Sequence, residues 1–446
     1  MRNSRLILLI ILTLAAVNIT KGQNPIIQDQ FTADPTARVF NGRVFVFPSH
    51  DIPAQPGRGR ANWFVMEDYH VFSSSNLTDW TDHGVIVSQN KVNWVDSTTF
   101  SMWAPDCIEK NGKFYFYFPA NVKQSFGRGS SVGVAIASNP SGPYVPQPEP
   151  IKGIRGIDPA LFIDKDGQAY IYWAGGNIFA AKLKDNLLEL ASDPIVVTEM
   201  PAKGLKEGPF LFERKGIYYM TYPHVENKTE RLEYATSDNP MGPFKFTGVI
   251  MDESPTGCWT NHHSIIEYNN QWYLFYHHND LSPKFDKNRS VRIDSLFFND
   301  DGTIRKVTPT LRGAGVTDAT REIQLDRYSQ ISNSGASIAF LDSLDTFKGW
   351  KVTLNKPGAW IRYNSVDFGN HKLKKIRVRV LSETGGTLLV RQDNPDGKVI
   401  AETDIPEGPG WITVEARVAK LQKGMHDLVV SLKDQGSVSA DWISFK

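Results

Sequence analysis

The chain has 446 residues, enough for two domains that each bury a hydrophobic core. Its 49 basic and 48 acidic residues nearly cancel, which argues against nucleic acid or another polyanion as a partner. Eleven tryptophans, 35 glycines and 26 prolines favour an all-β protein with many turns and exposed aromatic rings.

Residues 1–22 have the features of a secretory signal. Arg2 and Arg5 precede an apolar run from Leu6 to Val17. That run of about 12 residues is too short to span a bilayer. We expect cleavage near Gly22, and no cysteine ends the run to carry a lipid anchor. The mature protein is therefore expected to be exported, to the periplasm or outside the cell, with no membrane span.

One hairpin pattern recurs five times along the chain. In each copy a short apolar strand, a turn and an aromatic strand follow one another, which is typical of a β-hairpin. The turn residues are separated by 70, 55, 49 and 54 residues: Gly42, Gly112, Gly167, Gly216 and Asn270. A repeat of about 50 residues predicts a five-bladed β-propeller with four strands in each blade.

A polar side chain precedes each hairpin at nearly the same offset. These residues lie 8, 6, 9, 9 and 8 positions before the turn residue: Asp34, Asp106, Asp158, Glu207 and His262. In a propeller the first strand of each blade lines the central channel. The shared offset therefore predicts that the five side chains converge on one axis.

Carboxylates around one aromatic-lined channel indicate hydrolysis of a glycosidic bond. One acid protonates the leaving oxygen, another activates water or attacks carbon, and a third raises the pKa of the proton donor. A single Asp before Pro usually forms a turn, but the shared offset favours catalytic roles for Asp34, Asp158 and Glu207. Asp106 also fits the offset; its alternative role is to hold Trp103 at the channel mouth.

Further candidates each have a structural alternative. Trp103 either stacks on substrate or packs in the core. Of the tandem His262 and His263, one is expected to contact a metal or water unless both are hydrogen-bonded core groups. Arg289 and Arg292 follow the fifth hairpin, where either contacts substrate or forms a salt bridge.

The pattern changes near residues 308–320. We expect the propeller to span residues 23–315, and a separate β-sandwich (jelly-roll) domain to span 321–446, because short alternating strands there lack the repeat. Cys107 and Cys258 are expected to be buried free thiols rather than a disulfide.

At these residues the chain resembles glycoside hydrolase family 43, a family of five-bladed propellers. The resemblance rests on Ala33-Asp34-Pro35, Trp103-Ala104-Pro105, Gly156–Phe162, Lys206–Pro209 and Asn261–Ser264. It implies an inverting reaction in which Asp34 is the general base, Glu207 the general acid and Asp158 the residue that tunes the acid's pKa. It also implies that His262 contacts a central ion, often calcium, or a water, and that Arg289 binds substrate. Here Asn261 replaces the family's usual Gly before that His.

The C-terminal part resembles a family 6 carbohydrate-binding module. Gly358–Tyr363 and Asp441–Phe445 carry that likeness. The module usually begins with a Glu-x-Glu that helps bind calcium, whereas the matching positions here are Gln324 and Asp326. Trp350 and Trp360 are candidates for sugar contact, with packing as the favoured interpretation.

Together these features predict a monomeric, exported glycosidase acting on arabinose- or xylose-containing plant polysaccharide, most simply as an α-L-arabinofuranosidase. β-Xylosidase, endo-arabinanase and galactan-cleaving activities are alternatives within the family, and loops 50–62 and 121–129 are expected to decide among them. No organic cofactor is expected. A non-catalytic glycan-binding propeller is the alternative from a different class.

Overall fold

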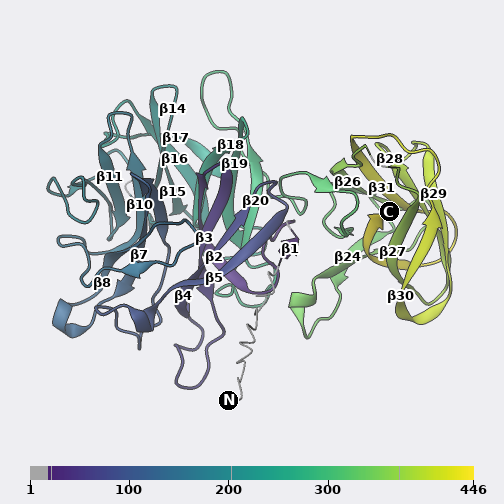
Figure 1. The fold of residues 1–446 in the computed structure, drawn as a ribbon, viewed down its shortest axis with the longest axis horizontal. Helices are drawn as coiled ribbons and strands as arrows, with labels where there is room; N and C mark the ends of the chain where they lie inside the picture. The colour runs from purple at the N-terminus through teal and green to yellow at the C-terminus, as the bar shows by residue number, and fades with distance from the viewer. Residues whose placement is uncertain (1–18, 22, 202, 371) are drawn as a thin grey trace, which may run out of the picture.

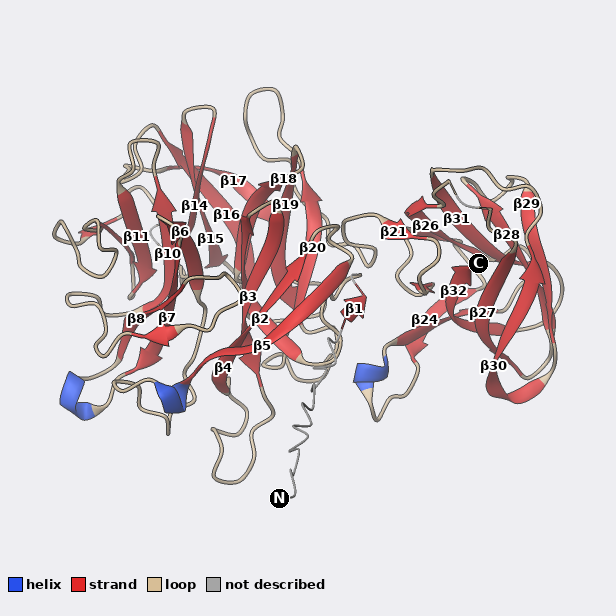
Figure 2. Cartoon of the chain, viewed as in Figure 1, coloured by secondary structure: helices blue, strands red, loops and turns tan. Residues whose placement is uncertain are grey.

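The computed structural model describes residues 19–21, 23–201, 203–370 and 372–446. Most of the predicted signal segment, residues 1–18 and Gly22, lies outside this part. The described chain forms a propeller followed by a sandwich, almost entirely from strands (Figure 1, Figure 2). Three short 3₁₀ turns occur within these described ranges: Gln89–Lys91, Gln124–Phe126 and Thr346–Lys348. Among the described residues, no helix has the length and apolar character needed to cross a bilayer.

Blades I and II form the N-terminal half of the ring. Blade I has the strand order β1-β5-β4-β3-β2 and blade II the order β6-β7-β8-β9. The strands are β1 (Ile19–Lys21), β2 (Phe31–Phe40), β3 (Arg43–Asp51), β4 (Met66–Ser74), β5 (Asp79–Ser88), β6 (Asp106–Lys110), β7 (Lys113–Asn121), β8 (Ser130–Ala137) and β9 (Val145–Pro146).

Blades III to V complete the ring, and each is again an antiparallel sheet built in chain order. Their strands are β10 (Ile157–Ile163), β11 (Ala169–Ala174), β12 (Ile178–Lys182), β13 (Ile195–Val196), β14 (Phe210–Arg214), β15 (Ile217–Val225), β16 (Glu230–Ser237), β17 (Lys245–Met251), β18 (His263–Tyr268), β19 (Gln271–His278) and β20 (Ser290–Leu296).

The hairpin turns explain why the repeat was visible in the sequence. In four of them both central residues have positive φ, as two-residue type I′ turns require. These pairs are Asn41/Gly42, Asn111/Gly112, Lys215/Gly216 and Asn269/Asn270. Each turn joins the first two strands of a blade, so the inner strand begins at a fixed distance before it.

The ring closes through its inner strands and through apolar clusters between neighbouring blades. β2, β6, β10 and β14 contact one another in turn, and β18 contacts both β14 and β2. Five buried clusters fill the five interfaces between blades. Phe47 against Phe116 packs blade I on blade II, for example. Burial of such aromatic side chains is the main stabilising contribution in this architecture.

The prediction of four strands per blade is wrong for blades I and V. Blade I gains β1, which pairs with β5. Blade V has three strands in the described chain. The N-terminal segment bonds to its last strand, since Ile26 N donates to Val291 O and Thr32 N to Arg289 O. This non-local pairing ties the start of the domain to its end and could not be read from the repeat.

The sandwich contains two six-stranded sheets around one apolar core. Its strands are β21 (Thr317–Asp318), β22 (Ile323–Gln324), β23 (Gln330–Ile331), β24 (Ala336–Phe340), β25 (Trp350–Leu354), β26 (Trp360–Asp367), β27 (Lys375–Ser382), β28 (Gly386–Gln392), β29 (Val399–Ile405), β30 (Gly408–Arg417), β31 (Met425–Leu432) and β32 (Val438–Phe445).

Several side chains of the sandwich have packing roles that bear on the sequence interpretation. Trp350 lies between Phe340, with ring centroids 5.0 Å apart, and the guanidinium of Arg327 at 3.5 Å, so it packs rather than presenting a free face. Arg327 also pairs with Asp326 at 2.5 Å and donates to Asn24 O in the propeller segment. Asp326 is therefore engaged in an ion pair at the domain junction.

Candidate active site

One cavity of about 170 Å³ brings together Asp34, Trp103, Asp158, Glu207, His262 and Arg289, all of them predicted site residues. Its lining comes from strands of blades I and III and from loops that lead into strands of blades I, II, IV and V. The lining residues are Asp34, Trp63, Phe64, Met66, Trp103, Ala104, Ile157, Asp158, Glu207, Trp259, Thr260, His262 and Arg289. A larger groove of about 650 Å³ lies between propeller and sandwich and contains none of the predicted site residues.

Asp34 and Asp158 reach the cavity through the same local structure. Each precedes a proline, each has positive φ (48° and 56°), and each sits at a register shift in its inner strand. A bulge of this kind re-aims a side chain and stores local strain, which surrounding structure must offset. The sequence placed Asp34 ahead of the strand, whereas it lies within β2 at this bulge.

Arg289 determines the charge state of Asp34. Its Nη1 and Nη2 donate to the two carboxylate oxygens at 2.6 and 3.1 Å, and Ser49 Oγ donates to Oδ2 at 2.8 Å. Burial alone would raise the pKa of Asp34, but the charge of Arg289 and these hydrogen bonds outweigh it and leave the pKa below its usual value. Asp34 is therefore a buried, ionised carboxylate.

Arg289 is itself held from a second side. Its Nε and Nη2 donate to the two oxygens of Asp51, each at 3.0 Å, and its backbone N donates to Asp51 at 2.8 Å. The guanidinium is buried, with 2% of the residue exposed. Two carboxylates thus occupy its donors, so Arg289 acts mainly as the partner that positions and charges Asp34.

The second carboxyl group of the cavity has the opposite shift. Burial raises the pKa of Glu207, and the negative charge of Asp34 raises it further. Asp158 accepts a hydrogen bond from Gly208 N at 2.9 Å, and burial together with repulsion by Glu207 raises the pKa of Asp158 well above its usual value. Carboxyl groups crowded in this way hold protons at pH values where an exposed acid has lost them.

Glu230 is a site residue that sequence reasoning missed. It begins β16, is 1% exposed, and its carboxyl is hydrogen-bonded to that of Glu207. Its Oε2 also accepts from Asn261 N at 2.7 Å. Burial and the charge of Glu207 raise the pKa of Glu230 well above its usual value. No motif marks this residue, because it lies on the third strand of its blade, outside the repeated offset.

Of the tandem histidines, His262 lines the cavity and His263 does not. His263 Nε2 lies 2.6 Å from Thr221 Oγ1 in the core. Burial lowers the pKa of His262 to about 4 despite the attraction of Asp34, so its imidazole is neutral. Gly208 has positive φ, and a Cβ there would lie 2.9 Å from His262 Nδ1. Glycine at this position therefore leaves room for the ring.

The donor set around His262 limits what ion it can hold. The side-chain amide atoms of neighbouring Asn261 are buried and lack a hydrogen-bond partner in the described chain, which marks a polar space suited to water or an ion. Calcium takes six to eight oxygen ligands. Within the residues that the structure covers, no group of three His, Cys, Asp or Glu ligands includes His262. The residues fit an ion that keeps most of its ligands as water.

Aromatic side chains form the mouth of the cavity. Trp103 is partly buried and lines it, as predicted, while its carbonyl accepts from Tyr69 Oη at 2.6 Å. Trp63, Phe64 and Trp259 were not singled out from the sequence. Trp63 directly follows loop 50–62, is 41% exposed, and its ring centroid lies 5.6 Å from that of Phe64. Flat aromatic faces of this kind suit the apolar faces of sugar rings.

Asp106 and Arg292 lie outside the cavity. The Asp106 carboxylate pairs with Arg38 at 2.6 Å and accepts from Leu161 N at 2.6 Å, so it joins the inner strands of blades I, II and III. Arg292 pairs with Asp280 and donates to Thr310 O. Arg292 therefore forms the salt bridge that was weighed as its alternative, whereas Asp106 joins three blades and was predicted neither to do so nor to bond Arg38.

Cys107 and Cys258 are free and buried, as expected. Burial raises the pKa of both thiols. A thiol without thiolate character is a poor nucleophile, so neither is suited to covalent chemistry.

Comparison with known proteins places this geometry in a family. Residues 22–304 match the model of glycosyl hydrolases family 43, and residues 331–446 match that of carbohydrate binding module family 6. The xylosidase/arabinosidase 43A of Humicola insolens is 36% identical over 329 residues, covering 63% of this chain and 98% of the relative. An arabinoxylan arabinofuranohydrolase of Bacillus subtilis strain 168 is 29% identical over 461 residues, covering 89% of this chain and 86% of the relative.

A solved structure shows the same fold. The β-xylosidase/α-arabinofuranosidase CoXyl43 from a compost microbial metagenome, in complex with xylotriose and in a calcium-free form, has a TM-score of 0.58 and 33% identity. The similarity covers 66% of this chain and 98% of that one. The five-bladed ring, the acidic cavity and these matches lead to one conclusion: the chain belongs to glycosyl hydrolase family 43, and it is a glycosidase joined to a family 6 carbohydrate-binding module.

Proposed function

We propose that the protein is an inverting glycosidase that removes terminal α-L-arabinofuranosyl units from arabinose- and xylose-containing plant polysaccharide. The observation that carries this proposal is the pair of opposite pKa shifts in one cavity, lowered at Asp34 and raised at Glu207. An inverting glycosidase needs one ionised and one protonated carboxyl group at the same time.

In the proposed reaction Asp34 takes a proton from water as that water attacks the anomeric carbon. Glu207 gives its proton to the leaving oxygen, so the bond to the aglycone breaks as the bond to water forms. Asp158 accepts a hydrogen bond from Gly208 N, and its carboxyl group and that of Glu207 repel each other when both are ionised, which opposes loss of the proton that Glu207 donates. His262 would face a Ca²⁺ ion at the centre, and such an ion supplies positive charge that stabilises carboxylates around it.

The size of the cavity favours a chain end as the substrate. Its volume of about 170 Å³ is below the range of about 300–1,000 Å³ typical of ligand pockets. The names of the relatives favour pentose substrates: the Humicola insolens protein is a xylosidase/arabinosidase, and the Bacillus subtilis protein acts on arabinoxylan.

β-Xylosidase activity is the second candidate function. It is favoured by a β-xylosidase of Xylanibacter ruminicola that is 33% identical over 322 residues, and by the xylotriose held in CoXyl43. We further propose that the protein is exported and acts as a monomer, with its sandwich near the polysaccharide.

Hydrolysis of 4-nitrophenyl α-L-arabinofuranoside and β-D-xyloside tests the proposal. We expect release of 4-nitrophenol from the arabinofuranoside first, and its loss in Asp34→Ala. Because 4-nitrophenol leaves with little help from an acid, Glu207→Ala should lose release of sugar from arabinoxylan and keep part of its activity on the nitrophenyl substrate. Glu213→Gln is the matched control, because Glu213 lies on the hairpin after Glu207, outside the cavity, and pairs with Lys165. Proton NMR of the first product should show inversion at the anomeric carbon.

Other outcomes select the alternatives. Faster hydrolysis of the xyloside would make this a β-xylosidase. Binding of glycans without release of any sugar, over a panel of plant polysaccharides, would favour a non-catalytic binding propeller. Activity that persists in both variants would refute the assigned roles.

A further inference from the structure

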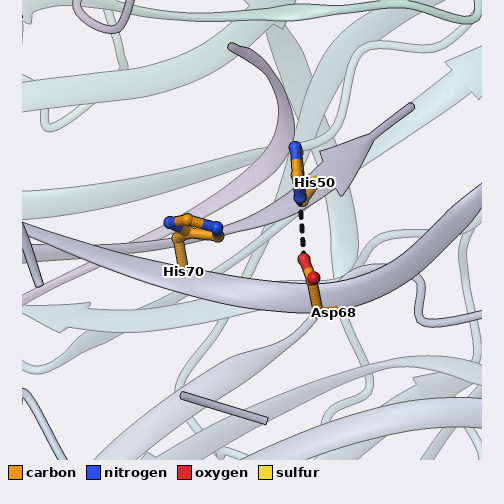
Figure 3. A group of neighbouring side chains, drawn as sticks. All are labelled: His50, Asp68 and His70. Atoms are coloured by element: carbon orange, nitrogen blue, oxygen red, sulfur yellow. Dashed lines mark hydrogen bonds and ion pairs between the residues drawn. The ribbon is translucent and has the colours of Figure 1, made fainter. Parts of the chain in front are cut away.

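A second cluster of side chains with metal-binding atoms lies on blade I, outside the cavity (Figure 3). His50 comes from β3, and Asp68 and His70 come from β4. Asp68 and His70 are two residues apart and share a face of the sheet. Ser49 pairs with Tyr69 across the strands, which sets His50 beside them. The three side chains are partly buried, whereas Ser49 and Tyr69 on the opposite face are fully buried.

The donor atoms are close enough to share one ion. One ligand atom from each of the three residues lies within 4.8 Å of the other two. Around a tetrahedral Zn²⁺ with bonds of about 2.1 Å, ligand atoms are about 3.4 Å apart, so small side-chain rotations close the site. Two imidazoles and one carboxylate form a donor set that suits zinc and related transition metals better than calcium, because calcium takes oxygen ligands.

A further carboxylate orients one of the rings. His70 Nδ1 lies 3.1 Å from both oxygens of Asp82, which leaves its Nε2 as the free ligand atom. Metal-bound histidines are commonly held by a carboxylate in this way. Three carboxylates, those of Asp29, Asp68 and Asp82, lie close enough to His70 to act on its charge. The surroundings are thus negative and favour a cation.

We propose that His50, Asp68 and His70 bind a divalent transition-metal ion of the zinc class, with water in the remaining position. His50 Nδ1 and Asp68 Oδ1 already lie 2.7 Å apart, so these two side chains need little movement to share one ion.

The position of this site suggests a structural effect. Along β3, Ser49 and Asp51 flank His50 and point the other way, where Ser49 bonds Asp34 and Asp51 bonds Arg289. An ion that joins β3 to β4 therefore stiffens the wall behind the catalytic base. The site is expected to stabilise the propeller without taking part in hydrolysis.

Zinc titration of the tag-free, chelator-treated full chain tests the proposal. Calorimetry should show one equivalent bound with a Kd in the micromolar range, and thermal unfolding should shift upward with zinc. Cobalt in place of zinc should give the visible absorption of a four-coordinate ion. His50→Gln and His70→Gln should each weaken zinc binding tenfold or more, and Asp82→Asn should weaken it about tenfold.

His83→Gln is the matched control, since His83 is an exposed histidine of the same blade that bonds Ser73 and is not part of the cluster. It should bind zinc as the unaltered protein does. Zinc binding that survives His50→Gln and His70→Gln, or a Kd above about 100 µM in the unaltered protein, would overturn the proposal. Should a variant fail to fold by circular dichroism, anomalous scattering from zinc-soaked crystals decides, and the absence of a peak between His50 and His70 would overturn it.

Discussion

Asp34-Pro35 in blade I and Asp158-Pro159 in blade III have one local structure and opposite protonation. Both aspartates have positive φ, both sit at a bulge, and both are about 95% buried. Burial acts to raise the pKa of both: the charge of Arg289 outweighs burial at Asp34 and lowers its pKa, whereas repulsion by Glu207 adds to burial at Asp158 and raises its pKa further. The local sequence therefore sets where each carboxylate points, and residues from other blades set what it can do.

Replacing Asp34 by Ala should have the largest effect on catalysis. General base catalysis typically contributes about 10²–10⁴-fold, and kcat/KM should fall by that factor. Substrate binding should change less, because the aromatic mouth of the cavity is intact. Steady-state kinetics of Asp34→Ala beside Glu213→Gln measures both. A loss confined to KM would argue that Asp34 binds substrate without acting as a base.

Removing the positive charge of Arg289 beside Asp34 should make Asp34 and Asp158 alike in protonation. Arg289→Met leaves Asp34 and Asp51 buried without their shared cation, and breaking a buried ion pair costs about 3–5 kcal/mol of stability. The pKa of Asp34 should rise in a variant that folds, so the acid limb of the activity profile should move to higher pH. Urea unfolding and a pH profile test this.

Arg289→Lys is the control for that experiment. Lysine keeps the charge but cannot reproduce the paired contacts. The stability of Arg289→Lys and the pKa of its Asp34 should therefore lie between those of Arg289→Met and of the unaltered protein. Equal stability of all three proteins would contradict the proposed role of Arg289.

Removing one of the two coupled carboxyl groups on the blade III side should act on the opposite limb. Asp158→Asn keeps an oxygen for Gly208 N but ends the repulsion between the ionised forms of Asp158 and Glu207. The pKa of Glu207 should fall, and activity at alkaline pH should be lost about one pH unit earlier. A shift of the acid limb instead would mean that Asp158 acts on Asp34.

The smallest expected effect is at Ser49. Ser49→Ala removes one hydrogen bond to an ionised carboxylate, worth about 1.5 kcal/mol. The pKa of Asp34 should rise by less than it does in Arg289→Met. Thermal unfolding and the acid limb of the pH profile should both show a small change, and a change as large as that of Arg289→Met would contradict this ranking.

Features fixed by short-range sequence could be predicted. The type I′ turns and the constant offset from each turn gave the five inner strands, and with them the meeting of Asp34, Asp158, Glu207 and His262 in one cavity. Asp106 lies 6 positions before its turn, where the other four lie 8 or 9 before theirs, and it starts β6 and bonds Arg38 outside the cavity. A common offset predicts that a side chain lies near the propeller axis. The residues packed around that side chain decide whether it faces the cavity or forms an ion pair.

Features that depend on several blades could not be predicted. Glu230 reaches Glu207 from a third strand, and Asp51 reaches Arg289 across 238 residues of sequence. Trp63 and Trp259 come from loops whose course is set by tertiary packing. The closure of blade V by the N-terminal segment belongs to the same class.

The pH profile of Glu207→Ala tests the central claim most directly. With a substrate whose leaving group needs no protonation, this variant retains measurable activity, and its kcat/KM can be followed over pH. The unaltered protein should lose activity as pH falls through the lowered pKa of Asp34 and as it rises through the raised pKa of Glu207. Glu207→Ala should keep the acid limb and lose the alkaline one. An alkaline limb that persists in Glu207→Ala would contradict the division of roles between the two carboxyl groups.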